Sequence, residues 1–356
     1  MADGINLPQD TLRIFDANLN RTAEGLRVLE DIARLSLNNS PISSHLKTMR
    51  HKVTQTNPTF QQELLWSRNS MNDVGRDTKV DGEPECKELA TILIANARRV
   101  QESLRVLEEL SKVSGMPPEL VSDNYKQARF SLYSLEQEML GLLLRQDKLK
   151  RLAGLYVIID GQWLKGRSHI EVTRQAIRGG ADVIQLREKT MSKKDLLSLA
   201  NEIRQVCNEQ NVLFIINDYL DVALDCKADG LHVGQTDLPV TVARQLLRPG
   251  QILGCSVNTV SEALAAKAEG ADHIGVGSIF ATSSKENIDI IGLDLLHQIT
   301  QAVSLPIVAI GGINKDNAAS VMAAGATALA VISAVSYADN PESAARDLVK
   351  IIKEKK

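Results

Sequence analysis

The stretch ADVIQLREK, residues 181–189, shows the pattern from which the fold class can be predicted. Within it, Asp182–Leu186 is a short apolar run that predicts a β-strand. The run ends in Arg187, Glu188 and Lys189. Isolated charges lose hydration when they are buried, so a charged cluster at a strand end indicates a ligand. Such strand ends form the active-site edge of parallel α/β proteins.

Seven more apolar runs follow the same pattern and alternate with amphipathic helical segments. The predicted strands are Gly154–Ile159, Asp182–Leu186, Leu213–Ile216, Gly230–Val233, Ile252–Ser256, His273–Val276, Pro306–Ile310 and Ala328–Ile332. The predicted helices include Lys193–Glu209, Val260–Glu269, Leu293–Val303, Lys315–Ala323 and Pro341–Lys353. Eight such units in about 200 residues predict a (β/α)8 TIM barrel. A doubly wound open sheet is the alternative. Polar residues after nearly every strand favour the closed ring, because an open sheet has a single switch point.

The first part of the chain contains an internal repeat, because Ala17–Glu30 recurs as Ala95–Glu108. Each copy carries apolar residues at helical spacing, so each predicts a two-helix unit, and together they predict a pseudo-twofold bundle. The apolar residues are Ile14, Leu19, Leu26, Leu29, Ile32 and Ala33, then Ile94, Ala97, Leu104, Leu107 and Leu110. Residues 69–85 are expected to link the copies. The expected domains are 1–145, an all-α repeat domain, and 146–356, the barrel.

Composition narrows the class of protein. A formal net charge of −3 argues against nucleic-acid binding, which depends on basic excess. The four cysteines, Cys86, Cys207, Cys226 and Cys255, lack the spacing of a zinc site or a disulfide framework. There is no basic start followed by an apolar run, and no stretch of membrane-spanning length. A cytoplasmic location without membrane or nucleic-acid partners is therefore expected.

The strand-end residues predict a diphosphate site with a divalent metal. Arg187 offers a planar fork and Lys189 a mobile charge for phosphate oxygens; an ion pair with Glu188 is the alternative. Asp218 and Asp237 end neighbouring strands, and Mg²⁺ is typically held by one or two carboxylates plus substrate phosphates. Asp237 could instead cap a helix ahead of Pro239.

A second phosphate site is predicted at the last strands. The loop Thr282-Ser283-Ser284-Lys285 supplies hydroxyls and a cation, and Gly311-Gly312 and Ser333 fit the phosphate site of a barrel. No nucleophile–base pair is recognised, and His232 and His273 are assigned structural roles. The predicted site is thus rich in phosphate and metal ligands but poor in acid–base groups. This composition favours a reaction in which a diphosphate leaves and a metal stabilises its charge.

Together these motifs resemble the thiamine-phosphate synthase family over about residues 146–356. The matching motifs are Gln185–Lys189, Asn217-Asp218, Gly230–Asp237, Gly254 and Ser256, Thr282–Lys285, Gly311–Ile313 and Ile332-Ser333. Family members join a hydroxymethylpyrimidine diphosphate to a thiazole phosphate through a dissociative step and release pyrophosphate. The loop departs from the family's usual sequence, with Ser278, Ala281 and Ser284 in place of two prolines and a threonine.

The resemblance implies roles for individual residues. It assigns the pyrimidine diphosphate to Gln185, Leu186, Arg187, Glu188, Lys189, Asn217 and Ser256, and Mg²⁺ to Asp218 and Asp237. It assigns the thiazole phosphate to Thr282, Ser283, Ser284, Lys285, Gly312, Ile332 and Ser333. Arg187, Lys189, Ser256 and Lys285 would carry the catalysis. The repeat domain resembles an extension of some bacterial, especially cyanobacterial, members, and its activity is left open.

Two other functions stay open. A thiazole tautomerase shares this barrel but relies on a histidine where the chain has Asn258. A regulatory protein could act through the helical domain, on the faces Arg21/Glu24/Arg27 and Arg99/Glu102/Arg105, although ion pairing along the helix is favoured there. Homo-oligomer formation and the preferred thiazole form are also left open.

Overall fold

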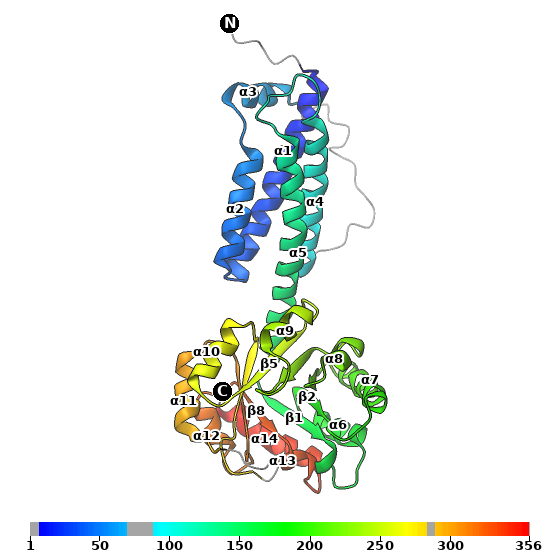
Figure 1. Cartoon of the computed structure of the whole chain (residues 1–356), viewed down its shortest axis with the longest axis vertical. Coiled ribbons are helices and arrows are strands. Elements are labelled where there is room, and N and C mark those ends of the chain that lie inside the picture. The colour runs from blue at the N-terminus through cyan, green and yellow to red at the C-terminus, as the bar shows by residue number, and fades with distance from the viewer. Residues whose placement is uncertain (1–6, 70–87, 283–288, 356) are drawn as a thin grey trace. The chain divides into compact units, whose positions relative to one another are not determined.

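The computed structural model describes residues 7–69, 88–282 and 289–355. The chain divides into two compact units, Met1–Leu143 and Leu144–Lys356, each with its own core. Within the described ranges, no helix is both long and apolar enough to span a membrane. Figure 1 labels the elements of both units.

The second unit is a closed barrel in which eight parallel strands pair in chain order. The strands are β1(Leu155–Asp160), β2(Val183–Arg187), β3(Leu213–Asn217), β4(Gly230–Val233), β5(Ile252–Val257), β6(His273–Val276), β7(Ile307–Ile310) and β8(Ala328–Val331). The pairing of β1 with β8 closes the ring and excludes the open sheet. The predicted TIM barrel is therefore confirmed, and each predicted strand overlaps the observed one.

Helices surround the barrel and follow the strands (Figure 1). They are η3(Gly161–Trp163), α6(His169–Arg178), α7(Lys193–Glu209), α8(Leu220–Asp225), α9(Val240–Leu246), α10(Val260–Ala268), α11(Gly292–Ala302), α12(Ala318–Ala323), α13(Ser333–Ser336) and α14(Pro341–Lys355). Several helices begin at a side-chain cap; Ser168 accepts from the N–H of Glu171, for example.

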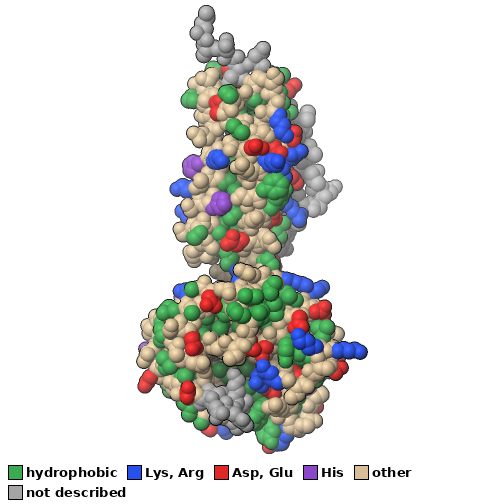
Figure 2. All heavy atoms as spheres, viewed as in Figure 1, with side chains coloured by type: hydrophobic (Ala, Val, Ile, Leu, Met, Phe, Trp, Pro, Cys, Tyr) green, Lys and Arg blue, Asp and Glu red, His purple; other side chains and the backbone are tan. Residues whose placement is uncertain are grey.

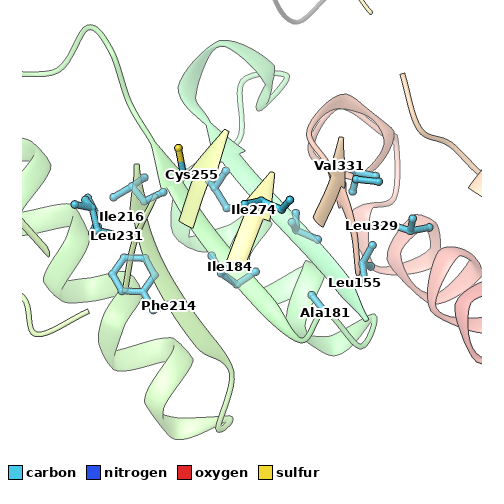
Figure 3. Packing of buried hydrophobic residues seen from close by; sticks show 14 of the residues in the cluster. Leu155, Ala181, Ile184, Phe214, Ile216, Leu231, Cys255, Ile274, Leu329 and Val331 are labelled. Carbon is cyan, nitrogen blue, oxygen red and sulfur yellow. The ribbon is translucent and has the colours of Figure 1, made fainter. Parts of the chain in front are cut away.

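Alternate strand residues point to opposite sides of the barrel wall. One set, including Ile184, Phe214 and Leu329, packs in the apolar layer against the helices (Figure 3). The other set, including Tyr156 and Ile215, fills the barrel interior. Full burial of each aliphatic side chain stabilises the fold by roughly 1.5–3 kcal/mol. Only the strand residues whose side chains point into the barrel can therefore contribute to a site inside the ring.

Every even-numbered strand is preceded by a polar residue that ties it to the strand before. The side chain of this polar residue accepts a hydrogen bond from a backbone N–H near the start of the odd-numbered strand. The bond pairs a backbone donor at the edge of the sheet. The pairs are Asp182 with Leu155 (2.9 Å), Asp229 with Phe214 (3.0 Å), Asp272 with Leu253 (2.8 Å) and Thr327 with Ile307 (3.0 Å). These turns fix the amino-terminal edge of the barrel, opposite to the strand ends of the predicted site.

The end of α5(Ser122–Arg151) belongs to the barrel unit and closes this amino-terminal edge. Arg145 lies 3.1 Å from Asp272 and Lys148 lies 3.2 Å from Asp229, so two of the turn carboxylates hold the helix end. Leu152 is fully buried in the barrel interior. A barrel fragment should therefore begin at Leu144.

The first unit is a helical bundle built from the two repeat copies. It contains α1(Gln9–Asp31), a π-helical segment η1(Ile32–Ser36), α2(Ser40–Thr54), α3(Pro58–Ser67), α4(Leu89–Leu110) and most of α5. The first copy forms α1 and α2 and the second forms α4 and α5. Helix α3 is additional, and Asn57, which accepts from the N–H of Phe60, caps its start. The predicted linker lies largely outside the described residues.

One of the apolar residues expected on the helical face of the bundle is not buried. Ile14 is 49% exposed, whereas Leu26, Leu29, Ala97 and Leu104 are fully buried as predicted. The buried stripe of α1 includes Leu12 and Phe15. Successive helical residues are about 100° apart, so Ile14 turns away from that stripe.

The polar residues of the repeat form equivalent buried ion-pair clusters. Glu30 lies 3.5 Å from Arg27 and 3.0 Å from Arg50. In the second copy, Glu108 lies 2.8 Å from Arg105 and 2.9 Å from Arg129. Both glutamates are almost fully buried. Arg27 and Arg105 are themselves about half exposed but pair with these buried acids, which supports ion pairing over a partner surface at these two positions.

Replacing Glu108 by alanine is expected to lower the stability of the bundle by about 3 kcal/mol, because a buried acid is lost and the cations remain. Thermal unfolding of the full chain measures the change. Glu109→Ala is the matched control, since Glu109 is half exposed and its ion pairs are worth at most about 1 kcal/mol. Equal unfolding temperatures for the two variants would contradict this account.

Candidate active site

A cavity of about 960 Å³ opens at the carboxyl ends of the barrel strands. Its volume is at the upper end of the range for small-molecule sites. Among the predicted site residues, it is lined by Gln185, Arg187, Lys189, Asn217, Asp218, Asp237, Ser256, Thr282, Gly312, Ile332 and Ser333. Ser283, Ser284 and Lys285 lie outside the described residues.

Two residues of the predicted strand-end cluster lie elsewhere. Leu186 packs in the apolar layer against the helices. Glu188 is 8% exposed and bonds to Thr190 (3.0 Å to its N, 2.9 Å to its Oγ1) and His169 (3.2 Å). Burial alone would raise the pKa of Glu188, but these hydrogen bonds outweigh it and lower the pKa. Glu188 therefore braces the loop after β2 and does not line the cavity.

Arg187 is oriented by a buried acid that the sequence did not reveal. Asp160, at the end of β1, is 3% exposed and accepts a hydrogen bond from Arg187 Nη1. Its other oxygen accepts from the N–H of Gln162 at 3.1 Å. Arginine has five donors in a fixed fork, so one bond to Asp160 leaves others for an anion. The alternative, an ion pair with Glu188, is not formed among the described residues, and Arg187 pairs with Asp160 on the neighbouring strand.

The predicted metal residues Asp218 and Asp237 lie side by side. Burial raises the pKa of Asp218, and the Asp237 carboxylate next to it raises the pKa further, while Lys189 opposes both effects. Lys189 Nζ donates to Asp218. Asp218 also has a left-handed φ of 61°, which is uncommon outside glycine, and its N–H donates to His232 O at 2.8 Å. Two repelling carboxylates at a cavity fit a divalent cation.

Asp237 is not a helix cap. Helix α9 begins at Val240 with Pro239 before it, and no side-chain cap bond is made there. Instead, Asp237 accepts the N–H of Gly234 at 2.8 Å, which holds its carboxylate at the cavity.

The cavity floor contains polar pairs that sequence reasoning missed. His232 Nε2 lies 2.9 Å from Ser256 Oγ, and both residues line the cavity. The sequence showed no nucleophile–base pair and assigned His232 a structural role, whereas the structure places its imidazole at the cavity beside a hydroxyl. Gln185 donates to Tyr156 Oη at 2.7 Å, and burial raises the pKa of Tyr156, so the phenol stays neutral. His273 is fully buried in the core, as predicted.

The loops after β6, β7 and β8 meet at the other side of the cavity. Gly312 has a left-handed φ of 64°, and a Cβ there would lie 2.4 Å from Ala281 O. Only glycine fits so close an approach. Ser278 donates to Phe280 O at 2.7 Å, so a hydroxyl fastens the start of the loop after β6. Ser333 begins α13 and is separated from the end of β8 by Ile332 alone.

An aromatic pair forms part of the rim. Trp163 and Tyr337 line the cavity and meet edge to face, with ring centroids 5.8 Å apart. Arg167 joins the two loops that carry them, since its Nη2 donates to Ser336 O at 2.9 Å and to Ala338 O at 2.8 Å. Neither aromatic residue belongs to a recognisable motif, so this rim could not be predicted from the sequence.

The charged residues of the site are concentrated in the cavity. Cations and acids are interspersed over the face of the molecule in Figure 2, in keeping with the formal net charge of −3. Within the cavity, Arg187 ends β2 and Lys189 follows it, and Asp218 and Asp237 follow β3 and β4. This arrangement can bind an anion directly and through a bridging cation.

Comparison with family models gives two matches. Residues 155–335 match the model described as thiamine monophosphate synthase. Residues 13–138 match the model described as the ThiD2 family. The two matches fall in the barrel and in the helical repeat region, respectively.

Curated relatives extend over the barrel or over both units. A thiamine-phosphate synthase of Synechocystis sp. is 36% identical over 96% of this chain and 96% of its own length. One from Methanocella arvoryzae is 51% identical over 56% of this chain and 94% of its own length. Among solved structures, a thiamine phosphate pyrophosphorylase from Pyrococcus furiosus matches with 40% identity and a TM-score of 0.54. That match covers 58% of this chain and 98% of the other.

Proposed function

The chain belongs to the thiamine monophosphate synthase family, and we propose that its barrel joins 4-amino-2-methyl-5-(diphosphooxymethyl)pyrimidine to a thiazole phosphate and releases pyrophosphate. The chain is a transferase of thiamine biosynthesis that forms thiamine phosphate. One observation carries the finer proposal. Arg187, Lys189, Asp218 and Asp237 line a single cavity together with the glycine loop of β7.

The pyrimidine diphosphate fits the polar half of the cavity, on β1 to β5. Arg187, held by Asp160, and Lys189 supply charge for the diphosphate oxygens. Gln185, Asn217 and Ser256 supply amide and hydroxyl groups, which suit the hydrogen-bonding edge of an aminopyrimidine.

Mg²⁺ fits the pair Asp218 and Asp237. Burial and the neighbouring Asp237 carboxylate raise the pKa of Asp218, and a divalent cation held by these two side chains would favour their ionised forms. When bound, the ion would supply positive charge for the departing diphosphate. Lys189, which donates to Asp218, would add a second positive charge next to the departing diphosphate.

The thiazole phosphate fits the half on β6 to β8. Backbone N–H groups around Gly312 and the Thr282 and Ser333 hydroxyls would bind the phosphate. Ile332, also in the lining, offers an apolar wall for the ring. The predicted contribution of Ser283, Ser284 and Lys285 remains part of the proposal.

The reaction needs little proton transfer. The bond between the pyrimidine methylene carbon and the diphosphate oxygen breaks, and its electron pair leaves with pyrophosphate. The lone pair of the thiazole nitrogen then forms the new carbon–nitrogen bond and leaves a thiazolium cation. No proton has to be removed from the nucleophile, so Arg187 and Lys189 act by stabilising charge.

The test is pyrophosphate release by the purified full chain with Mg²⁺. Pyrophosphate release is expected only when both substrates are present. One pyrophosphate should be released for each thiamine phosphate formed. Conversion of a thiazole phosphate tautomer without pyrophosphate release would favour the tautomerase instead. Asn258, which lies at the cavity, offers no imidazole for that reaction.

Asp160→Asn is expected to raise the KM for the pyrimidine diphosphate about tenfold, with a smaller change in kcat. The substitution keeps the shape of the side chain but removes the charge that orients Arg187. Steady-state kinetics measure both constants. Asp339→Asn is the matched control, because its ion pair with Lys165 is on the surface and should leave KM unchanged. An unchanged KM in Asp160→Asn would show that Arg187 needs no such anchor.

The barrel alone, residues 144–356, is expected to keep pyrophosphate release within about threefold of the full chain, because the site lies wholly within that unit. Starting at Leu144 preserves the Arg145–Asp272 contact. The measurement compares kcat/KM of the two chains. A folded barrel with no activity would support the alternative in which the helical unit regulates or completes the enzyme.

A further inference from the structure

Two histidines stand one above the other inside the barrel, beneath the cavity. His232 on β4 lines the cavity floor, and His273 at the start of β6 is fully buried below it. Their ring centroids are 5.8 Å apart. Gly254, on the strand between them, leaves the space for both rings. A Cβ there would lie 2.4 Å from His232 Nδ1 and 2.3 Å from His273 Nε2.

The upper ring meets a hydroxyl. His232 Nε2 lies 2.9 Å from Ser256 Oγ, on the neighbouring strand β5. Gly275, on β6, again leaves room, because a Cβ there would lie 2.9 Å from His232 Cε1. A free serine hydroxyl can rotate among three staggered positions. A fixed imidazole partner selects one of them, so His232 determines how the Ser256 hydroxyl faces the cavity.

The lower ring is a neutral packing partner. Among the residues that the structure describes, neither His273 nitrogen has a hydrogen-bond partner. Burial, and secondarily the neighbouring His232, lowers the pKa of His273 to about 3. His273 therefore adds no positive charge beneath His232 at neutral pH. It supports the ring from below through shape alone.

We propose that His232 is a positioning residue of the transfer reaction, which acts by holding the Ser256 hydroxyl in one orientation toward the pyrimidine diphosphate. The inference rests on the proposed function for the ligand of Ser256. It gives His232 a role that involves no contact with the reacting atoms and no proton transfer. The hydrogen bond orients the hydroxyl, so breaking it should slow the reaction. When Ser256 is already removed, breaking it should lower the rate little further.

The kinetic test uses His232→Leu, which keeps a similar volume without a polar atom, and His232→Gln, whose amide can restore a bond to Ser256. His232→Leu is expected to lower kcat about tenfold, and His232→Gln to restore it to within about threefold of wild type. In the double variant with Ser256→Ala, His232→Leu should cause no further loss. Additive losses would overturn the inference, and so would wild-type kcat in His232→Leu.

A matched control separates positioning from packing. The control is His273→Leu, because His273 is fully buried next to Gly254 and does not line the cavity. It should leave kcat within about twofold of wild type, and its unfolding temperature should not fall, because no hydrogen bond is lost. A tenfold loss of kcat in this variant would mean that the interior packing, not the bond to Ser256, controls the rate.

Nitrogen NMR of the imidazoles tests the contact without substrates. In the full chain, Ser256→Ala should shift the His232 Nε2 resonance and leave that of His273 in place. An unchanged His232 resonance would overturn the inference whatever the enzyme does. A wild-type chain that releases no pyrophosphate would overturn the proposed function. An active wild type together with an unaffected His232→Leu would overturn this inference alone.

Discussion

Asp218→Asn is expected to lower the rate of pyrophosphate release by about 10²- to 10³-fold, the size of effect seen when one group that stabilises transition-state charge is removed. Asp218 is both a proposed metal ligand and the acceptor of Lys189. Asparagine tolerates the left-handed φ of 61° at this position, so the backbone should be unaffected. The loss would then report on charge rather than on folding.

The measurement is kcat/KM at several Mg²⁺ concentrations, with the unfolding temperature as a check on the fold. Asp221→Asn is the matched control, since Asp221 is exposed and pairs with Lys193 on the surface. Wild-type rates in Asp218→Asn, at any Mg²⁺ concentration, would mean that the metal site lies elsewhere.

Lys189→Ala is expected to lower kcat/KM about 10²-fold, because the variant loses a cation proposed to contact the leaving diphosphate and to balance Asp218. Lys189→Arg should recover part of the loss, since charge is restored with a different geometry. Lys193→Ala, four residues further along the chain, removes an exposed lysine and should have no effect.

Rates measured for the Lys189 variant at saturating pyrimidine diphosphate give kcat, and rates at low concentration give kcat/KM. The two constants show whether Lys189 acts in substrate binding or in the chemical step. A fall in kcat together with kcat/KM would place the interaction in the transition state. An unchanged kcat/KM would remove Lys189 from the site.

The barrel could be predicted from sequence because its strands are short, apolar and regularly spaced. β4 and β6 were predicted with their exact observed bounds. The bundle was less predictable in detail. Helix α3 carries no counterpart in the repeat, so self-similarity could not indicate it. Ile14 satisfied an apolar pattern that its angular position on α1 does not support.

The site could be predicted where chemistry and strand ends coincide. Arg187, Asp218 and Asp237 line one cavity, as motif spacing had suggested. Strict alternation could also have excluded Leu186, because its neighbours Gln185 and Arg187 face the interior.

The missed residues depend on pairing between strands. Asp160 meets Arg187 because β1 pairs with β2 in a register that sets these two residues opposite each other. His232 reaches Ser256 from the adjacent strand β4. Neither register can be read from a single sequence, so both contacts required the structure.

Calorimetric titration of the full chain with pyrophosphate, with and without Mg²⁺, tests most directly whether the strand-end cavity is a magnesium–diphosphate site. We expect saturable binding that weakens at least about tenfold when Mg²⁺ is chelated and again in Arg187→Ala. Binding of equal strength in all three conditions, or none with Mg²⁺ present, would contradict the assignment.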